Sequence, residues 1–396
     1  MIVKKILWNF YCMRKQKIFF SSCAIKSLLT IPEFKVIKKI FIVSGANSYL
    51  STGVKEFVEQ NLKKYELYHF SGFRVNPKLE DVLAGIELFN KFNPELTIAI
   101  GGGSTLDMAK LINFLAVQNH DCEMLIKQQY FQSMHKPLKL IAIPTTSGSG
   151  SESTKFATIY IDFRKFSVEH DFLLPDYVIL DSKLTLTMAP SLAATSGMDA
   201  FAQAIESYWS VNSNKLSKIY SARAIKIILN SLVKSVQIGS IDFRSNMSKA
   251  ANLAGRAINI TKTTAPHALS YPITSHFGIP HGHAVAIFLP AFFIINSGWQ
   301  NLAVIDKRGK SYIKKNMSNL CKIMGCSNVV EASLKIKQIM KLIGLSNDLK
   351  EYNLDLKILK KLIKSELNLE RLSNNPIKIS NEIIDEIFDN KFRPRT

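Results

Sequence analysis

The first half of the chain alternates short apolar runs with longer stretches of helical periodicity. The runs typical of buried strands lie at 38–45, 65–73, 95–105 and 138–146. The stretches between them place apolar residues every three to four positions, at 52–65, 76–92 and 106–117. Strands that alternate with helices in this way predict an α/β domain with a parallel sheet covered on both faces.

The second half of the chain has a different pattern. Helical spacing recurs throughout it, at 190–210, 215–236, 246–261, 309–324, 329–344 and 354–368. None of these stretches is typical of a strand. The change of pattern falls within 176–190 and predicts two domains: a Rossmann-like parallel-sheet domain over 1–186 and an all-helical domain over 187–396. We expect the active site in the cleft between them, a favoured place for small-molecule chemistry.

Composition and charge narrow the class of protein. The net charge is +20, but the lysines are scattered among Ile and Asn along the helical stretches, which is typical of solvated helix faces. No nucleic-acid recognition motif accompanies them, so nucleic acid is not an expected partner. The five cysteines form no C-x-x-C pair and predict reduced thiols. Charges at Arg14, Lys15 and Lys17 interrupt any signal-like apolar run, and no stretch is long enough to span a membrane. We therefore expect a cytoplasmic protein.

Two polar loops follow the predicted strands. Gly101, Gly102 and Gly103 precede Ser104 at the start of a predicted helix, where free N–H groups and the positive end of the helix dipole suit a diphosphate. Asp107 would accept from first-turn amides or from a ligand ribose. The alternative is a purely structural turn, because the spacing matches neither a G-x-G-x-x-G nor a P-loop motif.

The second loop, 143–154, follows another strand with hydroxyls and glycines. It offers short donors to a cofactor, or it is a plain polar turn.

Four side chains in the helical half could hold a metal ion. Asp199 and Gln203 are four positions apart and share one helix face. His267 and His281 lie in the most histidine-rich segment of the chain. Two imidazoles, a carboxylate and an amide oxygen suit Fe²⁺, Zn²⁺ or Mn²⁺. On spacing alone, ordinary structural histidines beside a polar stripe remain the alternative.

Four motifs in the right order resemble the iron-containing (group III) alcohol dehydrogenases. These are GGGSTLDMAK, IPTTSGSGSE, ATSGMDAFAQAIESYWS and APHALSYPITSHFGIPHGHAVAIFLP. The resemblance covers roughly residues 10–300 and is most pronounced with the phosphonoacetaldehyde reductase branch. It implies an NAD(P)H-dependent enzyme with a divalent metal, Fe²⁺ or else Zn²⁺, held by the residues Asp199, Gln203, His267 and His281.

The resemblance also implies which residues contact the nucleotide. Gly101 to Ser104 and Asp107 match the diphosphate loop of the family. Thr145, Thr146 and Ser149 match its nicotinamide-side loop, and Lys165 matches a lysine that lines the cleft. The region 45–47 carries no carboxylate that would repel a 2′-phosphate, so NADP(H) is permitted alongside NAD(H).

Two positions depart from the family pattern. Gln203 stands where the family usually has a metal-binding histidine, and Tyr271 stands where it has a histidine linked to proton relay. The proton is therefore expected to come from water, from Tyr271 or from His283. Candidate partners for a phosphonate group are Lys155, Lys165 and Ser153.

The expected reaction is reduction of a small aldehyde, with phosphonoacetaldehyde giving 2-hydroxyethylphosphonate. The alternatives are a general short-chain alcohol dehydrogenase of the same family, or a metal-free descendant that binds nucleotide without catalysis. The resemblance also implies a homo-oligomer, with a dimer expected.

Overall fold

The computed structural model describes residues 16–118, 121–129, 131, 136–298, 302–352, 354–389 and 391–392. Arg14 and Lys15, used above to argue against a signal sequence, lie outside these residues. The chain forms two compact units. The first unit comprises 1–145 and 151–187, and the second comprises 146–150 and 188–396. Each unit is described separately.

A parallel sheet forms the centre of the first unit. Its strands, in spatial order, are β1 (Lys17–Ser21), β8 (Tyr177–Asp181), β5 (Lys139–Pro144), β4 (Leu96–Gly101), β2 (Lys39–Ser44) and β3 (Glu66–Phe70). Each neighbouring pair is parallel. The expected parallel-sheet domain is therefore confirmed.

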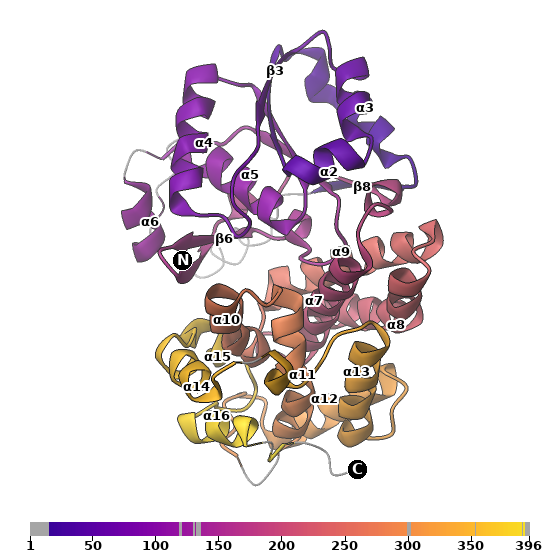
Figure 1. The fold of residues 1–396 in the computed structure, drawn as a ribbon, viewed down its shortest axis with the longest axis vertical. Helices are drawn as coiled ribbons and strands as arrows, with labels where there is room; N and C mark the ends of the chain where they lie inside the picture. Colours follow the sequence, from indigo (N-terminus) through magenta and orange to yellow (C-terminus); the bar gives the residue numbers. More distant parts are fainter. Residues whose placement is uncertain are drawn as a thin grey trace, which may run out of the picture. The chain divides into compact units, whose positions relative to one another are not determined.

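Successive residues of a strand point to opposite faces of the sheet. Both faces of this sheet are apolar, and helices cover them. Ile40 and Ile42 of β2 belong to one buried cluster, and Phe41 and Val43 belong to another. The helices of the first unit are α2 (Ala46–Ser51), α3 (Val54–Asn61), α4 (Leu79–Phe92), α5 (Gly103–Leu115) and α6 (Cys122–Gln128). Figure 1 shows α4 and α5 alongside the sheet of this unit.

Four strands were not predicted. β1 and β8 complete the sheet, and β6 (Phe156–Ile161) and β7 (Arg164–Glu169) form a separate antiparallel hairpin. β8 lies in the stretch that the sequence analysis took as the domain boundary. β7 is partly exposed and carries charged residues, so its hydrophobic pattern is weak, whereas β6 is mostly buried and apolar.

The second unit is helical, as expected (Figure 1). Its helices are α7 (Pro190–Trp209), α8 (Lys215–Gln237), α9 (Ile241–Thr261), α10 (Ala265–Phe277), α11 (His281–Asn296), α12 (Lys310–Ile323), α13 (Val329–Leu342), α14 (Leu356–Ser365), α15 (Leu369–Ser373) and α16 (Asn381–Phe388). No helix among the described residues is long and apolar enough to cross a membrane.

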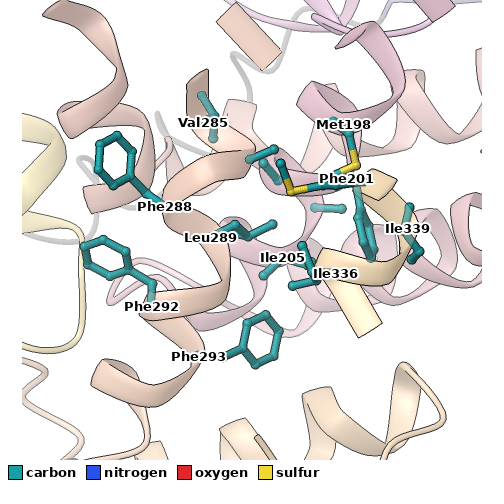
Figure 2. Packing of buried hydrophobic residues seen from close by; sticks show 14 of the residues in the cluster. Met198, Phe201, Ile205, Val285, Phe288, Leu289, Phe292, Phe293, Ile336 and Ile339 are labelled. Atoms are coloured by element: carbon teal, nitrogen blue, oxygen red, sulfur yellow. The ribbon is translucent and has the colours of Figure 1, made fainter. Parts of the chain in front are cut away.

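The core of the second unit gathers around α7 and α11. Figure 2 shows Met198 and Phe201 of α7 in one buried cluster with Leu289 and Phe293 of α11 and with Ile336 of α13. Because α7 and α11 share this packed core, the polar residues in the middle of α7 and at the start of α11 are held on a rigid support.

Candidate functional site

One face of α7 carries three buried polar residues. Asp199, Gln203 and Glu206 follow one another at spacings of four and three residues, which places them along one side of the helix. Their exposed fractions are 7%, 4% and 0%. A row of buried acids and amides is costly unless each group has a partner or a ligand.

The first turns of α10 and α11 bring two histidines to this face. His267 lies on α10 and His281 is the first residue of α11. One donor atom from each of Asp199, His267 and His281 lies within 4.8 Å of the other two. The centroids of the two imidazole rings are 5.3 Å apart. The structure therefore gathers these three predicted ligands into one cluster, which we call the donor cluster.

A glycine allows α11 to approach α7 closely. A Cβ atom at Gly282 would lie 2.0 Å from the carbonyl oxygen of Thr195 and 2.8 Å from Cβ of Asp199. Neither contact is tolerable, so only glycine fits between the two histidines of the sequence PHGHA. This contact sets the position of His281 relative to Asp199.

Glu206 orients the ring of His267. Its carboxylate accepts from Nδ1 of His267 at 2.5 Å and from the backbone N–H of Thr264 at 2.7 Å. Nε2 of His267 then faces Asp199, with 3.4 Å between Nε2 and Oδ1. A carboxylate behind a histidine is the usual second partner of a metal-binding imidazole.

Two carboxylates act on the ring of His267. Burial alone would lower the pKa of His267, but the carboxylates of Glu206 and Asp199 outweigh it and raise that pKa to about 10. The surrounding groups thus favour a positive charge at this point.

The nitrogen and the oxygen of the Gln203 side-chain amide differ in their hydrogen bonding. Its Nε2 donates to the carbonyl oxygen of Ser149 at 3.2 Å. Its Oε1 is buried and has no hydrogen-bond partner among the described residues. A flipped amide would set its oxygen against the Ser149 carbonyl, so this hydrogen bond fixes which atom points each way.

The donor set fits a divalent cation. A carboxylate and two imidazoles have donor atoms within 4.8 Å of one another, and one helical turn from the carboxylate lies an amide whose oxygen lacks a donor. These ligand types match the preferences of Fe²⁺, Zn²⁺ and Mn²⁺. Asp199, His267 and His281 would hold the ion, and Gln203 would supply a fourth, neutral oxygen.

The segment 146–150 belongs to the second unit, although the chain on either side of it belongs to the first. Ser147 and Ser248 of α9 share a hydrogen bond of 2.9 Å. Gly150 has φ +62°, and a Cβ atom there would lie 2.6 Å from Cα of Gly255. This segment, which includes Thr146 and Ser149, is therefore packed directly on α9.

The predicted diphosphate loop joins β4 to α5 in the first unit. β4 ends at Gly101, Gly102 is the N-cap of α5, and Gly103 and Ser104 form the first turn. Gly102 offers no capping side chain, so first-turn amides remain available to an anion. The backbone N–H of Thr145 donates to the Gly101 carbonyl at 3.0 Å, which places the end of β5 beside this loop.

Asp107 is engaged within the protein. It accepts from the Ser151 hydroxyl at 2.5 Å and from the Thr158 backbone N–H at 2.9 Å. Burial raises the pKa of its carboxyl, although Lys110 and Lys165 oppose the rise. The first-turn amides that sequence analysis suggested as its partners are not those it uses here.

Lys110 is the buried cation beside Asp107. Its Nζ donates to the backbone carbonyls of Ser151, Thr154 and Phe156 and lies 3.9 Å from Asp107. Burial lowers the pKa of this ammonium to about 8, although Asp107 opposes the decrease. Together the two residues fix the chain that follows the 146–150 segment.

Two family models cover nearly all of the sequence. Residues 15–182 match iron-containing alcohol dehydrogenase, and residues 193–392 match the C-terminal part of the Fe-containing alcohol dehydrogenase family. The chain belongs to the iron-containing alcohol dehydrogenase family.

Individual members of the family give the same result. The chain is 30% identical to NADPH-dependent butanol dehydrogenase of Clostridium saccharobutylicum, over 89% of this chain and 91% of that protein. It is 32% identical to aldehyde-alcohol dehydrogenase 2 of Entamoeba histolytica, over 69% of this chain but only 33% of that longer protein. Sulfoacetaldehyde reductase from Bifidobacterium kashiwanohense, solved with NAD⁺, superposes with a TM-score of 0.83 at 26% identity, covering 95% and 97% of the two chains.

The two side chains expected from the sequence to donate a proton lie in different surroundings. Tyr271 stacks on His281, with ring centroids 5.9 Å apart and an interplanar angle of 28°. His283 points to another part of the unit, where its Nε2 lies 2.6 Å from the Ser346 carbonyl oxygen and 2.9 Å from the Tyr352 hydroxyl. Burial lowers the pKa of His283. The structure thus places Tyr271, and not His283, beside the donor cluster.

Lys165 lies on β7, in the hairpin, where it is opposite Tyr160. The positive charge of Lys165 opposes the rise in the pKa of Asp107, so Lys165 lies near this residue of α5.

Sequence analysis overlooked three residues that shape these sites. Glu206 continues the spacing of Asp199 and Gln203 by three residues, so helix periodicity could have revealed it. Gly282 stands between two histidines, a position that suggests close approach. Lys110 had no such signal, because a lysine in an apolar helix is ordinarily exposed.

Proposed function

We propose that this chain is a metal-dependent oxidoreductase that reduces a small anionic aldehyde with NAD(P)H, phosphonoacetaldehyde being the favoured substrate. The observation that carries the proposal is the donor cluster of Asp199, His267 and His281, with Gln203, whose buried oxygen has no hydrogen-bond partner among the described residues, one helical turn from Asp199. A divalent cation in this cluster would supply Lewis acidity, which polarises a carbonyl and stabilises negative charge on its oxygen, and NAD(P)H would supply the hydride.

The side chains around the cluster have roles that follow from their contacts. Glu206 keeps Nδ1 of His267 protonated and leaves Nε2 as the donor atom. Tyr271, stacked on His281, is the hydroxyl that we assign to deliver the proton to the product oxygen. The amides of Gly103 and Ser104 would bind the nucleotide diphosphate.

The anionic substrate class rests on three supports. Sequence analysis relates the chain to the phosphonoacetaldehyde reductase branch. The solved sulfoacetaldehyde reductase acts on an aldehyde that carries a comparable charged group. The net charge of +20 favours the approach of an anion. Lys155 is an unsuitable partner for the phosphonate, because its ammonium already pairs with Glu169 at 3.4 Å and with Asp171 at 3.2 Å.

The test is an anaerobic reconstitution with Fe²⁺, Zn²⁺ or Mn²⁺, followed by assays with NADH and NADPH. Phosphonoacetaldehyde, sulfoacetaldehyde, acetaldehyde and butyraldehyde form the substrate panel. We expect cation-dependent oxidation of the nucleotide, fastest with phosphonoacetaldehyde. No oxidation with any aldehyde, in protein that has bound the cation, would refute the oxidoreductase proposal.

A general short-chain alcohol dehydrogenase is the second candidate. Its support is the butanol dehydrogenase relative, which matches this chain along most of its length. Faster turnover of butyraldehyde than of either anionic aldehyde would favour this candidate. A protein that binds nucleotide but no cation would instead indicate the non-catalytic descendant.

We also propose that the protein is a cytoplasmic homodimer that binds neither nucleic acid nor membranes. Light scattering on the purified chain tests its subunit number.

A further inference from the structure

The segment 146–150 is fixed to the second unit by its backbone. Gly148 packs on Ser196 of α7, where a Cβ atom would lie 2.8 Å from the Ser196 carbonyl oxygen. Gly150 packs on Gly255 of α9 in the same way. Between these two glycines, the carbonyl of Ser149 receives the N–H of Gln203. The middle of the segment is therefore hydrogen-bonded to Gln203, on the face of α7 that also carries Asp199.

The carboxamide of Gln203 connects the 146–150 segment to the face of α7 that carries Asp199. Its N–H is committed to the segment, while its buried oxygen, which has no hydrogen-bond partner among the described residues, is on the other side of the same planar group. A cation at the oxygen draws electrons from the amide and makes its N–H a stronger donor. The hydrogen bond to Ser149 should therefore strengthen when the cation binds.

We propose that Gln203 is a positioning residue that couples cation binding to nucleotide binding through the 146–150 segment. This inference rests on the proposed function, since it needs a protein that binds NAD(P)H. It also takes Thr146 and Ser149 as contacts of the nucleotide, as the family resemblance implies. Cation binding fixes the segment in the form that holds the nucleotide. By linkage, bound nucleotide raises the affinity for the cation by the same factor.

The substitution Gln203→Glu separates the two sides of the residue. Glutamate keeps an oxygen that can face the cation and adds a negative charge, but it has no N–H to donate to Ser149. The matched control is Asn316→Asp. Asn316 is also buried and donates to a backbone carbonyl, that of Tyr208, at 3.1 Å, and Lys218 is in place to pair with the new carboxylate.

The experiment is a binding cycle by titration calorimetry. The dissociation constants of NADH and NADPH are measured with and without Mn²⁺, and that of Mn²⁺ with and without nucleotide. In the wild type and in Asn316→Asp we expect Mn²⁺ to tighten nucleotide binding about three- to tenfold, the range of one hydrogen bond. Gln203→Glu should bind Mn²⁺ at least as tightly as the wild type, with a coupling factor near one.

Each result separates the inference from the proposed function. Wild-type protein that binds both ligands independently, or Gln203→Glu with wild-type coupling, overturns the inference and leaves the enzyme proposal standing. Wild-type protein that binds neither ligand overturns both. If Gln203→Glu does not fold, hydrogen exchange on the wild type decides: added Mn²⁺ should slow exchange of the amides at 147–150, and unchanged exchange overturns the coupling.

Discussion

Both units bury ionised side chains, but they balance them differently. In the first unit, the Asp107 carboxylate and the Lys110 ammonium lie 3.9 Å apart, and each has hydrogen-bond partners from the protein. In the second unit, Asp199 and Glu206 face opposite nitrogens of a single imidazole, that of His267. The first arrangement is complete within the chain, whereas in the second the ring of His281 joins Asp199 and His267 in a cluster whose donor atoms suit a cation.

This difference separates a scaffold from a ligand site. Buried charged groups are stable only where other groups of the protein or a ligand balance them. Asp107 and Lys110 fix the position of the chain after the 146–150 segment, and they require no ligand to do so. The donor cluster has the ligand types that a divalent cation prefers, and this makes it the stronger of the two sites as evidence for function.

Removing a cluster imidazole should have the largest effect. We expect His267→Ala and His281→Ala each to lose bound cation and turnover together, with turnover reduced more than about 100-fold, because even outer partners of metal ligands are worth 10- to 100-fold. Elemental analysis and nucleotide oxidation measure the two losses. His276→Ala is the control, since His276 lies on the same α10 and pairs with Glu366 away from the cluster. Turnover that survives without the cation would remove the Lewis-acid role.

The lowered pKa of the buried Lys110 should make the free energy of unfolding depend on pH. The pKa of Lys110 is lowered by burial to about 8 in the folded protein, against 10.5 for an exposed lysine. Below pH 8 the folded state bears the full cost of the buried charge. Between about pH 8 and pH 10.5 the unfolded chain holds the proton more tightly, so the wild type should gain stability with rising pH, by at most about 3 kcal/mol.

Urea unfolding of the wild type and Lys110→Met across this pH range measures that gain. The difference between the two free energies of unfolding should shift in favour of the wild type as the pH rises. Lys63→Met, which removes an exposed lysine of the same unit, should show no such trend. A constant difference between the wild type and Lys110→Met would mean that the charge of Lys110 is fully compensated.

Glu206 tests whether the carboxylate behind His267 strengthens cation binding. We expect Glu206→Gln to weaken cation binding about 10- to 100-fold, because the amide orients the ring of His267 but no longer raises its basicity. Glu366→Gln is the control, since it alters a glutamate–histidine pair on the surface of the same unit. Equal cation affinity in all three proteins would limit Glu206 to packing.

The sequence predicted the alternating first half and the helical second half, because buried strands and amphipathic helices have distinct hydrophobic periods. It did not predict α10 and α11, the helices that carry the two histidines. Prolines obscured them: Pro266 lies in the first turn of α10, where no N–H is needed, while Pro272 and Pro290 lie inside α10 and α11. Tertiary packing in the core outweighs those breaks.

The candidate site was predictable only as a set of residue types. Asp199 and Gln203 share a helix face by periodicity alone, and the family resemblance added His267 and His281. Nothing in the sequence revealed that Gln203 donates to Ser149, because that contact joins positions 54 apart through the packing of α7 against the 146–150 segment. The different surroundings of Tyr271 and His283 likewise depend on tertiary structure.

The glycine loop should give the smallest of these effects, since it binds through the backbone and not through a buried charge. Gly102 has φ −76° and ψ −176°, an extended conformation that valine adopts without strain. Gly102→Val should therefore fold normally, while its side chain crowds a ligand at the first turn of α5. We expect the dissociation constant of NADH or NADPH to rise about tenfold, a loss of about 1.4 kcal/mol of binding free energy. The cation affinity should not change. Ala116→Val, at the opposite end of α5, should leave both constants unchanged. Unaltered nucleotide binding in Gly102→Val would show that the diphosphate does not bind at this helix, and the first unit would then lose its proposed role even if the donor cluster kept its own.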